Sequence, residues 1–451
     1  MLDRSTVTSI AHRLIEASTA ERKRLDDIHD AVRDRAQWLY VPKKASQEYR
    51  DLIEQSRFNV LRLVIGQLAQ ALYVDGHRPS TGTENSSTWD AVWQANGMDA
   101  RQAGLYRSAI EYGYSYALVV PGRPAPVITP LSPRRCIASY EDMVSDQWPE
   151  YALVFHGRKA FLWDEEAAYA LAKDKDSREW VATGEYRRHG LGVVPLVRFL
   201  DSVADLDDGP TGKVEPLLPV QAQLNQLTFG LLMAAQFAAF KQKWVTGMAI
   251  AEDASGNPIE PFNAAVDRLF QGESPDTKFG EFSETDLSGY LNARDKALLY
   301  VSSVAQIPPH NLIVGAGISN ISAEALAALE AGHRQDVTEH QTSFGESAEQ
   351  MLRLAALAMG DQAAWEDTSG QVVWRDTTPR SIAQIADALG KMATLLEIPP
   401  RALWERIPGV TDTDLRRWEA MAAEDDLTGR LAEMLESGEP AAPVEEPDGA
   451  R

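Results

Sequence analysis

The stretch that most constrains the fold is the proline-free run over residues 322–359. Its apolar residues recur with helical spacing, Ser322 can serve as an N-cap, and Glu324 places a negative charge in the first turn. One continuous helix here would be roughly 55 Å long, at a rise of 1.5 Å per residue. We expect bends at Gly332 and Gly345. The rest of the chain must therefore be arranged around a helix that is longer than a small domain is wide.

A second helical segment precedes this run and is separated from it by a loop. Apolar residues recur with helical spacing up to Ile307, where Pro308 disfavours the α conformation of the residue before it. Pro308 and Pro309 begin the loop, and glycines and an asparagine punctuate the remainder. Residues 308–320 contain no Asp, Glu, Lys or Arg. The sequence thus predicts a helix, an uncharged loop and a long helix.

The most apolar helix is predicted over residues 216–243. No acidic residue occurs between residues 216 and 251, although the chain contains 66 of them. The helix is apolar on more than one side, so neighbouring helices or neighbouring subunits must cover it. Interruption by Gln and Asn leaves it too short and too polar to span a membrane. The residues expected to pack along its seam are Leu217, Val220, Leu224, Leu227 and Leu231.

Two lysines, Lys241 and Lys243, lie at the predicted end of this helix. Cations are favoured near a helix C-terminus, which is one explanation for them. The other is contact with DNA or with a docking partner. Residues 244–285 then show the pattern of short strands and turns, and residues 286–307 that of a second helix.

The first 215 residues divide into two parts by their periodicity. Residues 1–115 carry helical patterns, among them one or two helices over 5–41 and a strong one over 56–76. Residues 116–200 alternate strand-like runs with turn residues, which indicates a mainly β section. Residues 201–215 form an acidic linker with Gly and Pro.

The C-terminal part is predicted to be helical and then disordered. Residues 370–380 offer one short strand, and helices follow over residues 381–427. Between residues 419 and 451 there are ten acidic and two basic residues. We therefore predict a disordered acidic tail over residues 428–451.

The order of these features resembles that of the portal proteins of tailed bacteriophages. The runs IPPHNL and ISNISAEAL, and EYGYSYALVV after an Asn-Gly turn and a helix, carry the resemblance. It implies an α+β, predominantly helical fold that assembles as a ring. Its parts would be a wing (1–215), a first stem helix (216–243), a clip (244–285), a second stem helix (286–307), a tunnel loop (308–321), a long kinked helix with the wing return (322–380) and a small crown (381–427).

The resemblance also implies a function without catalysis. About twelve copies would form a ring at one capsid vertex, with a channel for packaging and ejection of double-stranded DNA. The ring would nucleate procapsid assembly and would bind the terminase large subunit, the major capsid and scaffolding proteins, and a head-completion or adaptor protein. It would be found in the virion, and in the host cytoplasm during assembly, with no membrane partner. The net charge of -22 suits a channel wall that must not grip the sliding duplex.

The loop would supply the channel-facing residues of such a ring. An uncharged, glycine-containing tip can constrict a channel without forming ion pairs with phosphates. The alternative is that residues 312–314 cap the adjacent helices as part of the core. The residues expected to face the channel are His310, Asn311, Leu312, Ile313, Val314, Gly315 and Gly317.

Motifs for catalysis or cofactor binding are incomplete. The run GPTGKV has two residues between its glycines where a phosphate loop has four, and Val214 follows Lys213 in place of Ser or Thr. His333 and His340 do not have zinc-site spacing, and we expect them on a polar helix face exposed to solvent or to another subunit. We therefore predict no catalytic residue, cofactor or metal. Two competing functions are a nucleotide-using enzyme on a helical scaffold and a helical scaffold or adaptor protein unrelated to phage.

Overall fold

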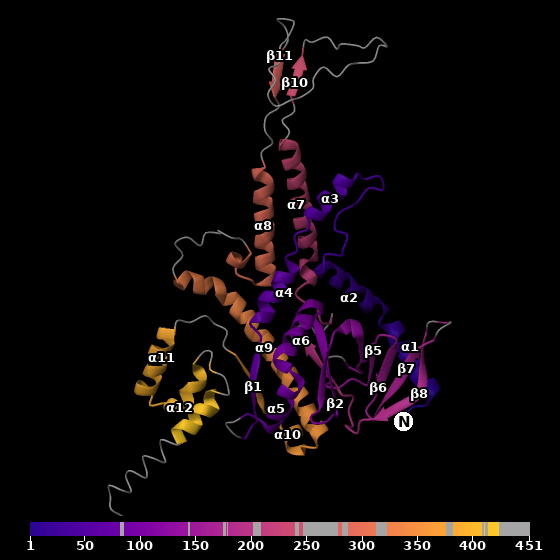
Figure 1. Cartoon of the computed structure of the whole chain (residues 1–451), viewed down its shortest axis with the longest axis vertical. Coiled ribbons are helices and arrows are strands. Elements are labelled where there is room, and N and C mark those ends of the chain that lie inside the picture. Colours follow the sequence, from indigo (N-terminus) through magenta and orange to yellow (C-terminus); the bar gives the residue numbers. More distant parts are fainter. Residues whose placement is uncertain are drawn as a thin grey trace, which may run out of the picture. The chain divides into compact units, whose positions relative to one another are not determined.

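The computed structural model divides into two compact units, Met1–Trp374 and Arg375–Arg451 (Figure 1). We describe each unit separately. The fold is α+β and mainly helical, as predicted. The residues described are 1–81, 85–142, 145–174, 177, 179–201, 209–239, 243–246, 278–281, 287–312, 323–375, 382–407, 410 and 414–423.

The first unit begins with six helices. Side chains of Asp3, Ser46 and Ser86 cap three of them by accepting hydrogen bonds from backbone N–H groups in the first turn. The helices are α1 (Arg4–Ala17), α2 (Thr19–Val32), α3 (Gln47–Gln55), α4 (Leu61–Gln70), α5 (Ser87–Val92) and α6 (Met98–Tyr112). The prediction of helices within residues 5–41 is confirmed.

The predicted helix over residues 56–76 is too long. Helix α4 covers only Leu61–Gln70, and strand β1 (Val74–Arg78) follows it. Gly76 therefore lies in a strand and not at the end of a helix. The reason is distant pairing, because β1 is antiparallel to β12 (Gln371–Trp374) from the far end of the unit.

Two antiparallel sheets follow, as predicted for residues 116–200. In the first, the order is β3-β2-β9, and α6 packs on its central strand. In the second, five consecutive strands pair in sequence order, and α1 buries Val7, Ala11 and Leu14 against it. The strands are β2 (Tyr114–Val120), β3 (Val127–Leu131), β4 (Cys136–Ser139), β5 (Tyr151–His156), β6 (Lys159–Trp163), β7 (Ala167–Lys173), β8 (Trp180–Arg188) and β9 (Leu196–Leu200).

Two helices, α7 (Leu218–Ala239) and α8 (Ser288–Ala305), lie side by side (Figure 1). A short turn of 3-10 helix, η3 (Glu215–Leu217), leads into α7. Beyond the two helices, β10 (Lys243–Thr246) and β11 (Lys278–Glu281) form an antiparallel pair. No helix in the described part of the chain is long and apolar enough to cross a membrane.

The predicted long helix is confirmed as α9 (Ala323–Met359), 37 residues that correspond to about 55 Å. The predicted N-cap Ser322 lies outside the described residues. Both glycines expected at bends lie within this helix, and a Cβ added at Gly345 would be 3.5 Å from Val372 of β12. Phe344 of α9 stacks on Tyr106 of α6, with 5.3 Å between ring centroids, in the centre of the main core. Helix α10 (Gln362–Glu366) follows α9.

The second unit contains the helices predicted over residues 381–427. These are α11 (Ile382–Leu395), α12 (Pro400–Leu403), the 3-10 turn η5 (Trp404–Arg406) and a helix over residues 414–423. Trp404 and Trp418 meet edge to face, with 6.0 Å between their ring centroids. The tail predicted as disordered, 428–451, lies outside the described residues.

Candidate functional site: the stem helices and the middle of the long helix

The seam predicted for the first stem helix is buried near the N-terminal (lower) end of α7. It is only half-covered toward the C-terminal (upper) end. Leu217 and Leu224 are completely buried in the main core. Val220 and Leu227 are half-buried against the same core, and Leu231 is also half-buried. Contacts within this one chain thus cover the lower seam fully and the upper seam only in part.

Two buried amides fix the lower end of α7 to the segment that enters α4. Gln221 accepts a hydrogen bond from Val60 N at 3.0 Å and donates one to Phe58 O at 2.7 Å. Asn225 accepts one from Phe58 N at 3.1 Å. Both side chains are 1% exposed. In the sequence, Asn225 stands out only as a polar interruption of an apolar helix. Its partner, the backbone N–H of Phe58, lies far away in the sequence.

The second stem helix, α8, leaves large apolar side chains in solvent. Tyr300 is 61% exposed, and Leu299 and Val304 are exposed as well. Contact between α7 and α8 is close, since a Cβ added at Gly230 would lie 2.9 Å from the Tyr290 ring. The two helices pack on each other and still leave apolar surface uncovered.

Lys243, one of the two lysines predicted at the clip end, does not lie on the helix. Helix α7 ends at Ala239, and Lys243 begins strand β10, where its register partner is Glu281. The predicted helix end at residue 243 was wrong, because strand pairing with β11 begins there. Lys241 lies outside the described residues. A contact of either lysine with DNA or a docking partner stays a prediction.

Of the first three residues predicted to face a channel, Asn311 and Leu312 contact other parts of the same chain. His310 and Asn311 lie in the 3-10 turn η4 (Pro309–Asn311) after α8, and Leu312 directly follows it. Asn311 Nδ2 donates to Gln67 Oε1 of α4 at 3.3 Å, and Leu312 packs against the main core. The Nδ1 atom of His310 is buried with no hydrogen-bond partner in the part of the chain described. These contacts favour the capping role for Leu312.

The remaining predicted channel residues, Ile313, Val314, Gly315 and Gly317, lie outside the described residues. His310 to Leu312 therefore form the anchored end of the segment. Any part of it that projects must begin after Leu312.

A buried ionic cluster lies beside the middle of α9. His340 Nε2 lies 3.0 Å from Asp201 Oδ1, and its Nδ1 lies 2.7 Å from the backbone oxygen of Asp336. Lys213 Nζ lies 2.5 Å from Asp336 Oδ1. The exposed fractions of Asp201, His340 and Asp336 are 3%, 2% and 3%. The expectation that His340 faces solvent or another subunit is therefore wrong, because this chain supplies its acidic partners.

The pKa directions show what holds the cluster together. Burial raises the pKa of Asp201, and the hydrogen bond and charge of His340 oppose that shift. Burial alone would lower the pKa of His340, but Asp201 and Asp336 raise it overall. With His340 protonated, two carboxylates face two cations, so the buried charges balance.

The run GPTGKV (209–214) places Lys213 in this cluster. Gly113, at the end of α6, has a φ of +95°, and a Cβ there would lie 2.5 Å from Pro210 O. A Cβ on Gly212 would lie 2.6 Å from Gly113 N. The segment therefore passes against the end of α6 where side chains do not fit. It is a tight connection that places Lys213 beside Asp336, and no phosphate role is needed to explain its glycines.

Comparison with known families identifies the chain. Residues 11–427 match the family model described as "Phage portal protein, SPP1 Gp6-like". The chain belongs to this phage portal protein family. No curated protein matches it significantly. The family and the mixed, mainly helical fold confirm the resemblance noted in the sequence.

Solved structures of gene transfer agent (GTA) particles also resemble this portal-family chain. One, the "Virion of native gene transfer agent (GTA) particle", is 16% identical with a TM-score of 0.45, covering 83% of this chain and 99% of that one. Another, the "Neck of native GTA particle computed with C12 symmetry", is 15% identical with a TM-score of 0.43, covering 80% and 96%.

The described residues contain no group of three or more His, Cys, Asp or Glu side chains placed to hold a metal ion. The portal family is a structural one.

Proposed function

We propose that this chain is the subunit of a portal ring in a phage-like particle. The observation that carries the proposal is the family match over residues 11–427. About twelve copies would surround a channel at one vertex of the capsid, where the ring nucleates procapsid assembly. The protein would then be a component of the virion, made and assembled in the host cytoplasm.

The stem helices supply the surface for ring closure. Leu231 of α7 is half-buried, and Tyr300 and Val304 of α8 are exposed. In a ring each copy meets two neighbours through two different faces. Apolar side chains that one chain leaves uncovered on the α7–α8 pair would be buried against the adjacent copies.

The channel would carry double-stranded DNA without gripping it. The subunit has a net charge of -22, and residues 308–320 carry no charged side chain apart from the titratable His310. Phosphates are repelled by the acidic protein and find no cation on this segment to pair with. The strand pair β10–β11, which begins with Lys243, would face the terminase large subunit and later a head-completion or adaptor protein, and Lys241 and Lys243 would contact that partner or the DNA. The major capsid and scaffolding proteins would surround the wing.

The DNA role is tested by changing only the part of the loop beyond its anchored end. We expect replacement of residues 313–317 by a Gly/Ser linker to leave rings intact and to reduce the DNA packaged per particle. The matched control is Asn311→Ala, which removes the hydrogen bond to Gln67 at the base and keeps residues 313–317.

Two results would contradict the channel role of the loop. One is packaging equal to the wild type in the linker variant. The other is failure of that variant to assemble, which would make residues 313–317 part of the packing. Release of phosphate from ATP by the purified wild-type protein would instead support the competing nucleotide-using enzyme.

A further inference from the structure

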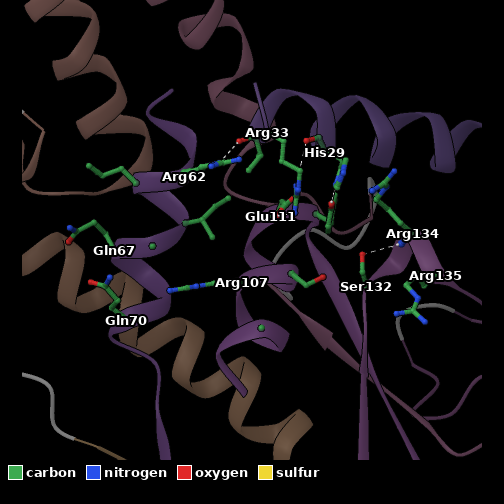
Figure 2. A pocket seen from close by; sticks show the side chains of 17 residues that line it. His29, Arg33, Arg62, Gln67, Gln70, Arg107, Glu111, Ser132, Arg134 and Arg135 are labelled. Atoms are coloured by element: carbon green, nitrogen blue, oxygen red, sulfur yellow. Dashed lines mark hydrogen bonds and ion pairs between the residues drawn. The ribbon is translucent and has the colours of Figure 1, made fainter. Parts of the chain in front are cut away.

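A groove with a volume of about 880 Å³ lies among α2, α4 and α6 (Figure 2). Its walls carry five arginines and one acidic residue, Glu111, which gives them a formal charge of +4. The whole chain carries -22. The arginines are Arg33, Arg62, Arg107, Arg134 and Arg135.

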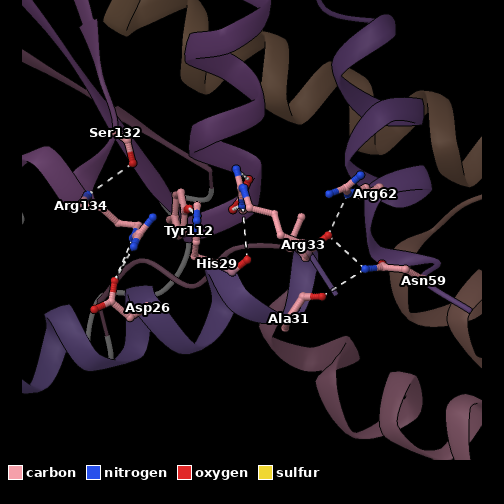
Figure 3. A network of polar contacts seen from close by, with 11 residues as sticks. Asp26, His29, Ala31, Arg33, Asn59, Arg62, Tyr112, Ser132 and Arg134 are labelled. Carbon is pink, nitrogen blue, oxygen red and sulfur yellow. Dashed lines mark hydrogen bonds and ion pairs between the residues drawn. The ribbon is translucent and has the colours of Figure 1, made fainter. Parts of the chain in front are cut away.

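Contacts within the chain hold most of these arginines in place (Figure 3). Arg33 pairs with Glu111 at 2.5 Å, and Arg134 pairs with Asp26 at 2.8 Å. Arg62 Nε donates to the backbone oxygen of Val32 at the end of α2, at 2.9 Å. Such contacts fix the guanidinium groups of the walls before any ligand arrives.

Arg107 differs from the others. It is exposed on α6, and it has no hydrogen bond or ion pair to any described residue. Figure 2 shows its side chain extending from α6 toward α4. An exposed arginine on the wall of a positive groove, with no partner among the described residues, can pair with an anionic group from outside the chain.

The pKa of the nearby histidine, His29, is also affected by the positive charge of the arginines. His29 of α2 lines the groove and contacts the Tyr112 hydroxyl at 3.0 Å. Burial lowers the pKa of His29, and the charges of Arg33 and Arg134 lower it further. The histidine therefore stays neutral near pH 7 and adds no charge of its own.

The floor of the groove suits a polypeptide better than a nucleic acid. Val32, Leu63 and Ile65 give it an apolar surface. The groove is open at Gly66 and Gly104, because no atom lies within 4 Å of a Cβ added at either glycine. Apolar contact surrounded by arginine is the usual composition of a protein interface. A DNA backbone offers phosphates but few apolar groups for such a floor.

We propose that this groove binds a carboxylate-bearing surface of a second copy of this chain. The inference rests on the proposed ring, in which each contact joins two different faces. Copies that each carry -22 repel one another, and a contact at which opposite charges meet offsets part of this repulsion; the groove presents positive charge for such a contact. Arg107 would form its ion pair across the subunit boundary.

The test compares two charge reversals on the same helix by sedimentation. We expect Arg107→Glu to weaken association of the copies by about tenfold or more, because it places a carboxylate against carboxylates. Its circular dichroism should match the wild type, since Arg107 has no partner within the described chain. Arg101→Glu is the control, because Arg101 is exposed on α6 and does not line the groove. It should assemble as the wild type does.

Each contrary result has a distinct meaning. Assembly of Arg107→Glu equal to that of Arg101→Glu would overturn the groove proposal and leave the ring intact. A wild-type protein that stays monomeric at every concentration would overturn the ring, and the groove proposal with it. Normal assembly of Arg107→Glu with loss of binding to a double-stranded DNA fragment would make the groove a nucleic-acid surface, which also contradicts the proposal.

Discussion

The middle of α9 and the upper part of α7 both carry side chains that need a partner, but the chain supplies the partners only in the first case. Around the middle of α9, Asp201 and His340 are nearly inaccessible and each has a partner. On the stem, Leu231 is half-buried, and Tyr300 of the neighbouring helix is 61% exposed. The chain thus buries and pairs the polar cluster around α9 by itself, whereas the α7–α8 pair leaves apolar side chains in solvent that the proposed ring would cover.

The largest expected effect is at the lower end of α7. Leu224 is 0% exposed in the main core, so Leu224→Asp would bury a charge with no partner. We expect this variant to be insoluble or unfolded. Leu224→Ala should remain folded and lose about 2–5 kcal/mol of unfolding free energy, as measured by urea denaturation. Wild-type stability of both variants would show that the lower seam is not core.

The next effect concerns the ionic cluster. Asp201→Ala leaves His340 buried without its acidic partner, and we expect a loss of about 3–5 kcal/mol of unfolding free energy. The matched control is Asp27→Ala on α2, which breaks an exposed pair with Lys23. Because exposed pairs contribute little, that variant should unfold at the wild-type urea concentration. Equal midpoints for the two variants would contradict the importance of the buried cluster.

A smaller effect should appear as a pH dependence of stability. The folded-state pKa of His340 is raised above its usual value of about 6.5. Its contribution is therefore fully present below about pH 6.5 and is lost as the pH rises through the raised pKa. The charged groups around it are Asp201, Asp336 and Lys213. Thermal unfolding between about pH 6 and pH 9 should show this fall for the wild type and a flatter profile for His340→Gln. Parallel profiles would contradict the assignment.

Local pattern was enough to predict most of the fold. Helical periodicity located α7, α8 and α9, and alternation located the β section, because each of these signals lies within one segment. The errors occurred where distant partners decide the structure. Strand β1 replaces the end of a predicted helix because β12 pairs with it. Lys243 leaves the helix because β11 pairs with β10.

The candidate site was only partly visible in the sequence. The seam of α7 was predicted, since its spacing is regular. The cluster of Asp201, Lys213, Asp336 and His340 was missed, because its members come from three separate segments and no spacing rule links them. One weak signal was present: Gly212 directly precedes Lys213, and glycine is the residue used where another backbone approaches closely.

The central claim is that the upper stem is folded in one chain and completed only by its neighbours. The measurement that tests it most directly is electron microscopy of the wild type beside Leu231→Asp, with urea unfolding of both. We expect the wild type to form closed rings with an axial opening. We expect Leu231→Asp to give folded, unassembled subunits, with an unfolding free energy changed by about 1 kcal/mol or less. Rings of normal appearance in the Leu231→Asp sample would contradict the claim.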